Sequence, residues 1–110
     1  MTNTSTYKKK GKELYFEGKF LEAIKNFNLE IEREPKDSGS WGYRGRCKYF
    51  LKQDLEALKD FDKAIELDPE DSTNWDFRGT CKYYLKQYEE AIKDFDKAIE
   101  LDPEDSTNWD

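Results

Sequence analysis

The sequence contains no histidine, and its two cysteines, Cys47 and Cys81, are isolated rather than paired in a CxxC motif. Histidine is the usual acid or base near neutral pH and the commonest ligand of transition metals, and two lone thiols would make an incomplete zinc site. A glycine-rich phosphate loop and a nucleophile–base set are also missing. We therefore expect no catalytic residue, no metal site and no cofactor, so the protein is not expected to be an enzyme. Both cysteines are interpreted as small packing residues.

Long apolar segments are also missing. No run approaches the roughly 18 residues that a membrane span needs, and the polar beginning MTNTSTYKKK has no apolar core of a signal peptide. The 19 Lys and Arg residues are outnumbered by 25 Asp and Glu residues, which gives a net charge of -6. Because affinity for phosphate backbones comes from clustered basic residues, we expect no binding to nucleic acid. The missing apolar segments lead us to expect a cytoplasmic protein that does not bind membranes.

Aromatic residues make up 15% of the sequence, and they recur at a fixed interval. Residues 37–70 and 71–104 are identical at 25 of 34 positions, and 3–36 is a diverged copy of the same pattern. A fixed period of this size is typical of stacked-repeat architectures. Seven types of position recur in the copies: Tyr7, Trp41, Trp75 and Trp109; Gly11, Gly45 and Gly79; Tyr15, Tyr49 and Tyr83; Ala23, Ala57 and Ala91; Phe27, Phe61 and Phe95; Ile31, Ile65 and Ile99; Pro35, Pro69 and Pro103.

Each copy is interpreted as two helices. Ala57, Phe61 and Ile65 have the spacing that gives a helix one apolar face. Pro69 cannot continue that helix, and Asp71 can cap the start of the next one. The acidic residues 68–71 are therefore interpreted as a turn rather than a calcium loop. The pattern predicts first helices at about 4–17, 38–51 and 72–85, and second helices at about 20–33, 54–67 and 88–101.

An aromatic residue followed by Gly in one helix, Ala with Phe four residues later in the next, and a final Pro make each copy similar to the tetratricopeptide repeat. The resemblance covers essentially the whole chain. It implies an all-α fold, a right-handed superhelical stack of antiparallel helix–turn–helix repeats. It also implies a single domain, 1–110, with repeats at 3–36, 37–70 and 71–104 and the start of a fourth at 105–110. One departure recurs, because Arg44 and Lys48, like Arg78 and Lys82, occupy places where the family often has Leu and Tyr.

The charges are divided between the two kinds of helix. The three first helices carry nine basic and three acidic residues, whereas the three second helices sum to about -7. In the family's superhelix the first helices line the concave surface. The resemblance therefore implies a groove that is more basic than the protein as a whole, and local charge governs partner choice.

The resemblance implies a peptide-binding groove of aromatic rings with cations toward its N-terminal end. Three of the rings, Tyr15, Tyr49 and Tyr83, could equally well pack between helices instead of contacting a ligand. Exposed rings, in contrast, usually mark interfaces. We expect a protein or peptide partner with acidic and apolar residues, its carboxylates attracted by Lys8, Lys12 and Arg46. The expected groove residues are Lys8, Lys12, Phe16, Tyr43, Arg46, Tyr49, Phe50, Phe77, Thr80, Tyr83 and Tyr84, and the carry-over also places Tyr15 and Asp76 there.

One well-known subset of the family grips the C-terminal carboxylate of heat-shock chaperones with two Lys, two Asn and an Arg. Only Lys8 matches that set here, because the other four places hold Lys12, Tyr43, Thr73 and Phe77. We therefore expect the chaperone-tail clamp to be absent.

A second hypothesis is assembly through the end of the array. Solenoids normally finish with a polar capping helix, whereas this sequence stops six residues into a fourth repeat. Either the native chain continues the array, or the apolar end self-associates head to tail with another copy. The residues expected at that interface are Ile92, Phe95, Ile99 and Trp109.

Overall fold

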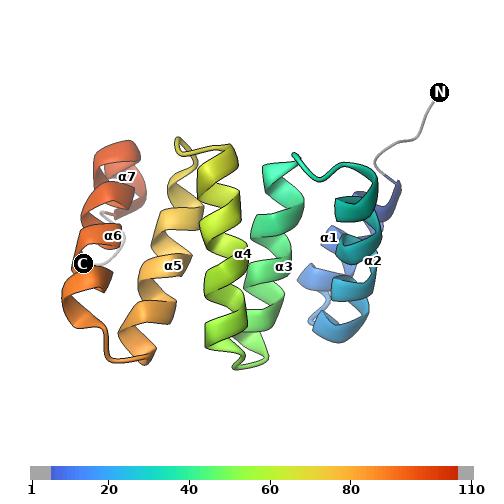
Figure 1. Cartoon of the computed structure of the whole chain (residues 1–110), viewed down its shortest axis with the longest axis horizontal. Helices are drawn as coiled ribbons and strands as arrows, with labels where there is room; N and C mark the ends of the chain where they lie inside the picture. Colours follow the sequence, from blue (N-terminus) through green and yellow to red (C-terminus); the bar gives the residue numbers. More distant parts are fainter. Residues whose placement is uncertain (1–5, 107–110) are drawn as a thin grey trace.

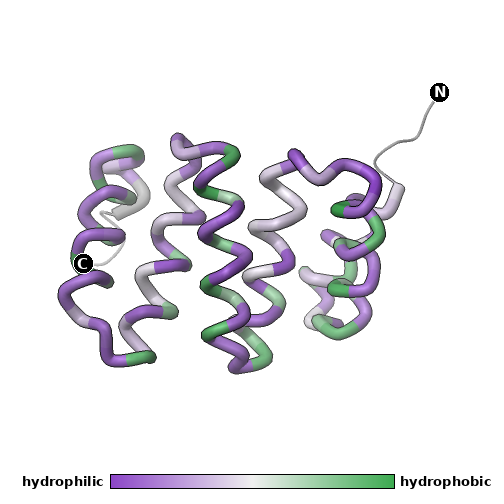
Figure 2. Tube along the Cα trace, viewed as in Figure 1, coloured by the Kyte–Doolittle hydropathy of each residue, from purple (hydrophilic) through white to green (hydrophobic). Residues whose placement is uncertain are grey.

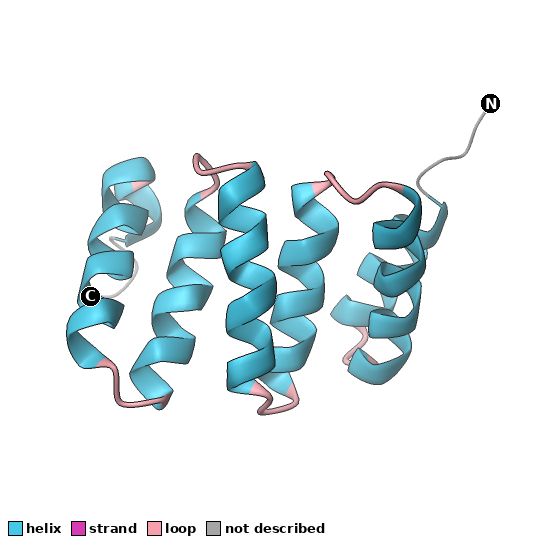
Figure 3. Cartoon of the chain, in the orientation of Figure 1, coloured by secondary structure: helices cyan, strands magenta, loops and turns pink. Residues whose placement is uncertain are grey.

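The computed structural model describes residues 6–106, which form helices and short loops without any strand in that range (Figure 3). The helices are α1 (Thr6–Phe16), α2 (Phe20–Arg33), α3 (Ser38–Phe50), α4 (Asp54–Leu67), α5 (Ser72–Tyr84), α6 (Tyr88–Leu101) and the single turn α7 (Pro103–Ser106). The observed bounds confirm the six long helices predicted from the repeat. Residues 4 and 5 of the first predicted helix lie outside the described residues.

The helices form antiparallel hairpins that stand side by side in sequence order (Figure 1). Within each hairpin α1 packs on α2, α3 on α4 and α5 on α6, and the stack continues through contacts of α2 with α3 and of α4 with α5. The array measures 42 × 26 × 25 Å. The expected all-α helical stack is confirmed.

Contacts between alternate helices show which way the array bends. Helix α1 touches α3, and α3 touches α5, whereas over residues 6–106 no corresponding contact joins α2 to α4 or α4 to α6. The first helices of the hairpins therefore lie closer together than the second helices. We call the surface formed by α1, α3 and α5 the inner face.

The core is built from buried aromatic rings set against glycines. Phe27 and Phe61 are fully buried, and a Cβ atom added to Gly45 would lie 2.8 Å from Cε1 of Phe61. Each ring also reaches the next hairpin, because Phe61 stacks on Phe77 at 5.8 Å between centroids and Phe27 stacks on Tyr43 at 5.7 Å. Polar and apolar residues alternate along the helices (Figure 2), as expected of helices that bury one side.

Aspartates and tryptophans fix the turns between hairpins. The Asp71 carboxylate accepts a hydrogen bond from the backbone N–H of Thr73 at 3.0 Å, so Asp71 is an N-cap as predicted. The Trp41 indole donates to the Pro35 carbonyl at 2.8 Å, and Trp75 donates to the Pro69 carbonyl in the same way. These bonds tie each first helix to the turn before it.

The departure from the family pattern is accounted for by buried ion pairs between paired helices. The Asp60 carboxylate, 3% exposed, accepts from Arg44 at 2.8 Å and lies 3.1 Å from the Lys48 ammonium. Arg78 and Lys82 meet Asp94 in the same arrangement in the next hairpin. Four of the basic residues counted on the first helices therefore face the second helices. The sum of charges by helix overstates the positive charge of the inner face for this reason.

Both cysteines are free and fully buried. Burial raises the pKa of the Cys47 thiol, and likewise that of Cys81, to about 12. Their interpretation as packing residues agrees with these positions. Over residues 6–106, no helix combines the length and apolar character needed to cross a bilayer.

Candidate functional site

The inner face carries a continuous set of aromatic rings. Tyr15 lies 5.4 Å from Tyr43 and 6.1 Å from Phe50, measured between ring centroids. One hairpin further along, Tyr49 lies 5.8 Å from Phe77 and 6.3 Å from Tyr84. We call the ring set of α1, α3 and α5 the aromatic face, and its members are Tyr15, Phe16, Tyr43, Tyr49, Phe50, Phe77 and Tyr84.

Five large rings of the first helices remain exposed to solvent, and Tyr7 is the least exposed of them at 39%. The exposed fractions are 71% for Phe16, 46% for Phe50, 52% for Tyr83 and 60% for Tyr84. Exposed apolar patches on a folded domain are typical of binding surfaces. Of the three tyrosines with the alternative of packing between helices, Tyr15 and Tyr49 are partly buried against the core. Burial raises the pKa of both hydroxyls.

Arg46 is surrounded by the aromatic face. The guanidinium carbon lies 4.2 Å from the Tyr43 ring centroid, 5.2 Å from that of Phe77 and 5.9 Å from that of Tyr15. The Arg46 Nε atom is buried and has no hydrogen-bond partner among residues 6–106. Lys12 extends this positive region, with its ammonium 5.5 Å from the Tyr43 ring. The arrangement can hold a carboxylate against a surface made largely of rings.

Two of the expected groove residues make bonds within the protein. The Lys8 ammonium pairs with the Asp37 carboxylate at 3.1 Å, and the Thr80 hydroxyl donates to the Asp76 carbonyl one turn earlier at 3.0 Å. Tyr83 lies 5.5 Å from Tyr88 of α6, edge to face. Apart from Asp76, the remaining expected groove residues belong to the aromatic face or to the positive region around Tyr43.

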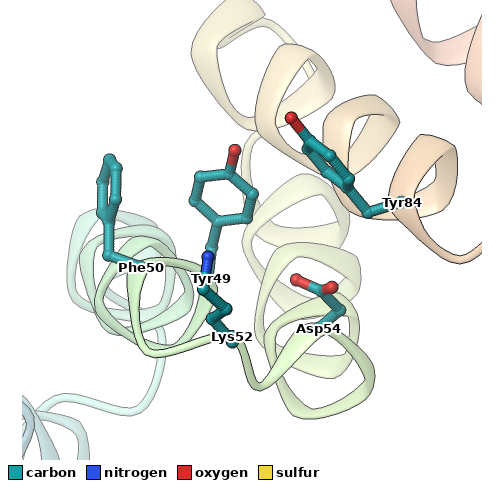
Figure 4. Close-up of a pocket in the computed structure, with 5 residues that line it drawn as sticks. All are labelled: Tyr49, Phe50, Lys52, Asp54 and Tyr84. Atoms are coloured by element: carbon teal, nitrogen blue, oxygen red, sulfur yellow. The ribbon is translucent and has the colours of Figure 1, made fainter.

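A pocket of about 340 Å³ opens beside the aromatic face, where α3 ends and α4 begins. It is lined by Tyr49, Phe50, Lys52, Asp54 and Tyr84. Figure 4 shows the Tyr49 ring between those of Phe50 and Tyr84, with the Asp54 carboxylate on the Tyr84 side. We call this space the Asp54 pocket.

Lys52 and Asp54 were not predicted as site residues. For Asp54 the 34-residue offset carries a signal, because this residue falls at the place that holds Phe20 and Tyr88 in the other copies. A small side chain at a position otherwise occupied by a ring leaves space beside it.

The residues expected at the end of the array differ in exposure. Ile92 and Ile99 are exposed, whereas Phe95 is partly buried, and its ring would lie 2.9 Å from a Cβ atom added to Gly79. Helix α7 contacts α6. Trp109 lies outside the described residues.

Family models identify the repeat. A model described as tetratricopeptide repeat matches residues 39–71, and another model with the same description matches residues 77–105. No curated protein matches the sequence.

Solved structures match nearly the whole chain. The first TPR of Spaghetti (RPAP3), bound to the HSP90 peptide SRMEEVD, is 27% identical with a TM-score of 0.88, over 92% of this chain and 80% of that chain. The yeast Sti1 structure described as a TPR2B-domain:pHsp70-complex is 28% identical with a TM-score of 0.87, over 92% of this chain and 81% of that chain. The Arabidopsis OM64 TPR domain is 25% identical with a TM-score of 0.88, over 91% of this chain and 83% of that chain.

Proposed function

Because the chain belongs to the tetratricopeptide repeat family, we propose that it is an interaction scaffold that binds a peptide segment of a partner protein on its inner face. Two of the similar structures, those of Spaghetti and Sti1, hold peptides of HSP90 and HSP70. These similarities favour peptide binding over assembly through the end of the array. The family's repeats are scaffolds rather than catalysts, and we extend that role to this chain.

The observation that carries the proposal is the environment of Arg46. A guanidinium is always charged, and it forms its strongest hydrogen bonds with carboxylates. Here three rings surround it, and its buried Nε atom has no hydrogen-bond partner in the part of the chain that the structure describes. Leaving a buried donor unsatisfied costs about 1–3 kcal/mol, so a shift of the Arg46 side chain that brings Nε to a partner carboxylate would recover part of that cost.

The exposed rings beside Arg46 define the rest of the ligand. Phe16, Phe50 and Tyr84 can cover apolar side chains of a peptide. The preferred ligand is therefore a segment in which an acidic residue is flanked by apolar ones. This composition matches the expectation from the sequence.

The chaperone-tail clamp is not part of the proposal. Lys8 is the sole residue that matches the clamp set, and its ammonium is paired with Asp37. Tyr43 and Phe77, at two other places of that set, face the Arg46 guanidinium as rings. A carboxylate bound here would meet Arg46 rather than the clamp.

A randomised peptide library displayed on phage tests the function. We expect the wild-type protein to enrich peptides that share an acidic residue and an aromatic or aliphatic one. Arg46→Gln should weaken these peptides at least about tenfold, since it removes the charge from a partly desolvated ion pair. Lys59→Gln is the matched control, because it removes one positive charge from an ammonium whose side chain is 75% exposed on α4.

Both variants must first show the thermal midpoint of the wild-type protein by circular dichroism. Equal affinity of the selected peptides for the wild type and for Arg46→Gln would exclude the inner face as the binding site.

A further inference from the structure

The Asp54 pocket occurs at the one hairpin that lacks a ring at the start of its second helix. Helices α2 and α6 begin with Phe20 and Tyr88, whereas α4 begins with Asp54. Phe20 lies 5.9 Å from Tyr15, and Tyr88 lies 5.5 Å from Tyr83, with both pairs edge to face. Tyr49, the equivalent of Tyr15 and Tyr83, therefore has no such partner.

The first hairpin shows what fits at this place. There the Phe20 ring stacks on Phe50 with 5.2 Å between centroids and 12° between planes. Tyr84 is the equivalent of Phe50 one hairpin later. Among the described residues, the rings near Tyr84 are Tyr49, which is tilted by 41°, and Tyr83, which is edge-on. No aromatic ring of residues 6–106 stacks on Tyr84 as Phe20 stacks on Phe50.

Two charged groups line the same space. No ammonium or guanidinium in the described part of the chain lies within 4.0 Å of the Asp54 carboxylate. The Lys52 side chain also lines the pocket and belongs to an exposed residue. In the view of Figure 4, the nitrogen of Lys52 lies at the base of the Tyr49 side chain, between Phe50 and Asp54.

We propose that the Asp54 pocket is a subsite for an arginine side chain of the bound peptide, an inference that rests on the proposed function. A guanidinium is flat, so it can stack on Tyr84 in the manner of Phe20 on Phe50. It also presents paired N–H donors that match a carboxylate, and Asp54 supplies that carboxylate. The ring stack and the ion pair together select arginine.

Other side chains can form either the stack on Tyr84 or the ion pair with Asp54, but not both. A phenylalanine would cover Tyr84 but would remove water from the Asp54 carboxylate without giving it a donor, which is unfavourable. A lysine would pair with Asp54 but lacks a flat face for the stack. A glutamate would be repelled by the negative charge of Asp54.

A carboxylate at the start of a helix also favours the helix dipole. That role does not account for Asp54, because α2 and α6 begin with aromatic residues at the same place. Glu56 already gives α4 an acidic first turn, as Glu22 does for α2.

The test uses the full chain labelled with ¹⁵N and the blocked amino acid N-acetyl-arginine-N-methylamide as probe. We expect amide shifts at Tyr49, Gln53 and Tyr84, with a dissociation constant at least about threefold lower than those of the lysine and phenylalanine probes. Asp54→Asn should weaken the arginine probe about threefold or more, since the charge is lost while shape is kept. Lys52→Gln should strengthen it, because a nearby positive charge is removed.

Tighter binding of the phenylalanine probe than of the arginine probe would overturn the inference, and so would an arginine affinity that Asp54→Asn leaves unchanged. The same holds if the arginine probe causes no shifts at all. The peptide selection keeps the two proposals separate. Peptides that depend on Arg46 but bind equally to the wild type and to Asp54→Asn would support the inner face and reject the arginine subsite.

Discussion

The Arg44 guanidinium and the Asp60 carboxylate form a two-bond ion pair between α3 and α4. Nε lies 2.9 Å from Oδ2, and Nη2 lies 2.8 Å from Oδ1. Lys48 adds a second positive charge at 3.1 Å. The same hairpin positions in the family often hold apolar or aromatic residues, so here charge replaces apolar packing between paired helices. Buried charges of this kind are stable only as a complete set.

Removing the Asp60 charge should therefore be costly. Asp60→Asn leaves Arg44 and Lys48 largely buried without a counter-ion, and we expect the free energy of unfolding to fall by about 3 kcal/mol. Asp62→Asn is the matched control, because Asp62 also pairs with an arginine, Arg78, but its side chain is 63% exposed. The control should lose less than about 1 kcal/mol. Urea unfolding measures both, and equal losses would contradict the role given to Asp60.

Adding one methyl group at Gly45 should disturb the same hairpin. The new Cβ of Gly45→Ala would lie 2.8 Å from the Phe61 ring, so the two helices must separate. We expect a net loss of about 1–2 kcal/mol in unfolding free energy, after the gain in helix propensity is counted. Gly39→Ala is the control, since its Cβ would meet the movable end of Lys8. If both variants kept the wild-type thermal midpoint, close helix contact at Gly45 would not be required.

The buried thiols should make stability depend on alkaline pH. Burial raises the pKa values of Cys47 and Cys81 to about 12 from the ordinary 9.0. Between these pH values the unfolded chain loses thiol protons that the folded chain keeps, so the unfolding free energy falls as pH rises. The slope approaches about 1.4 kcal/mol per pH unit for each thiol.

Urea unfolding under reducing conditions at several pH values from 8 to 11 measures that slope. In the double variant Cys47→Ala/Cys81→Ala the unfolding free energy should fall less steeply with pH, even if the variant is less stable at every pH. Some dependence should remain above pH 10, because burial is also the main cause of the raised pKa values of Tyr15 and Tyr49. An unchanged slope would assign the effect to other groups.

Exposed apolar residues of a first helix and of a second helix should differ in their effect on binding but not on stability. Phe16 and Leu21 are 71% and 64% exposed, and they lie on α1 and α2. We expect Phe16→Ala to weaken selected peptides by about 1–2 kcal/mol, while Leu21→Ala leaves affinity unchanged. Both should keep the wild-type unfolding free energy to within about 0.5 kcal/mol. Isothermal titration calorimetry with one selected peptide measures both affinities. Equal affinities of Phe16→Ala and Leu21→Ala would contradict binding at the aromatic face.

Filling the Asp54 pocket from within should stabilise the fold. Asp54→Phe restores the ring that Phe20 supplies in the first hairpin, where the stack on Phe50 has 5.2 Å between centroids. Relative to Asp54→Ala, we expect a gain of about 0.5–1.5 kcal/mol in unfolding free energy. Using Ala as the reference removes the effect of losing the charge. A thermal midpoint of Asp54→Phe no higher than that of Asp54→Ala would show that Phe20 and the pocket are not equivalent.

The periodic features of the fold were predictable from sequence. Apolar residues such as Ala57 and Phe61 repeat with helical spacing, and Pro69 and Asp71 set the turn, so the helix bounds followed closely. The close approach of the Phe61 ring to Gly45 was also predictable as a type of contact, because a glycine and a phenylalanine recur together at the 34-residue offset. These features depend on local spacing.

The direction of the charged side chains was not predictable in the same way. Arg44 and Arg46 lie two residues apart on α3, yet Arg44 turns to Asp60 of the paired helix, whereas Arg46 lies among rings of neighbouring first helices. A charge count for a whole helix cannot separate these two sides. The Asp54 pocket was missed because it comes from the space left by a short side chain, which depends on three helices at once.

The two boundaries between hairpins share a buried ring stack, Phe27 on Tyr43 and Phe61 on Phe77, but differ in their outer contacts. Between the first and second hairpins, Phe20 stacks on Phe50, and Arg44 donates to the neutral amide oxygen of Asn28. Between the second and third, the corresponding bond joins Arg78 to the exposed carboxylate of Asp62. Dissolved ions screen exposed charge pairs but leave ring stacking intact. Concentrated salt therefore weakens one polar contact between the second and third hairpins, while the stack of Phe61 on Phe77 across the same boundary is left intact.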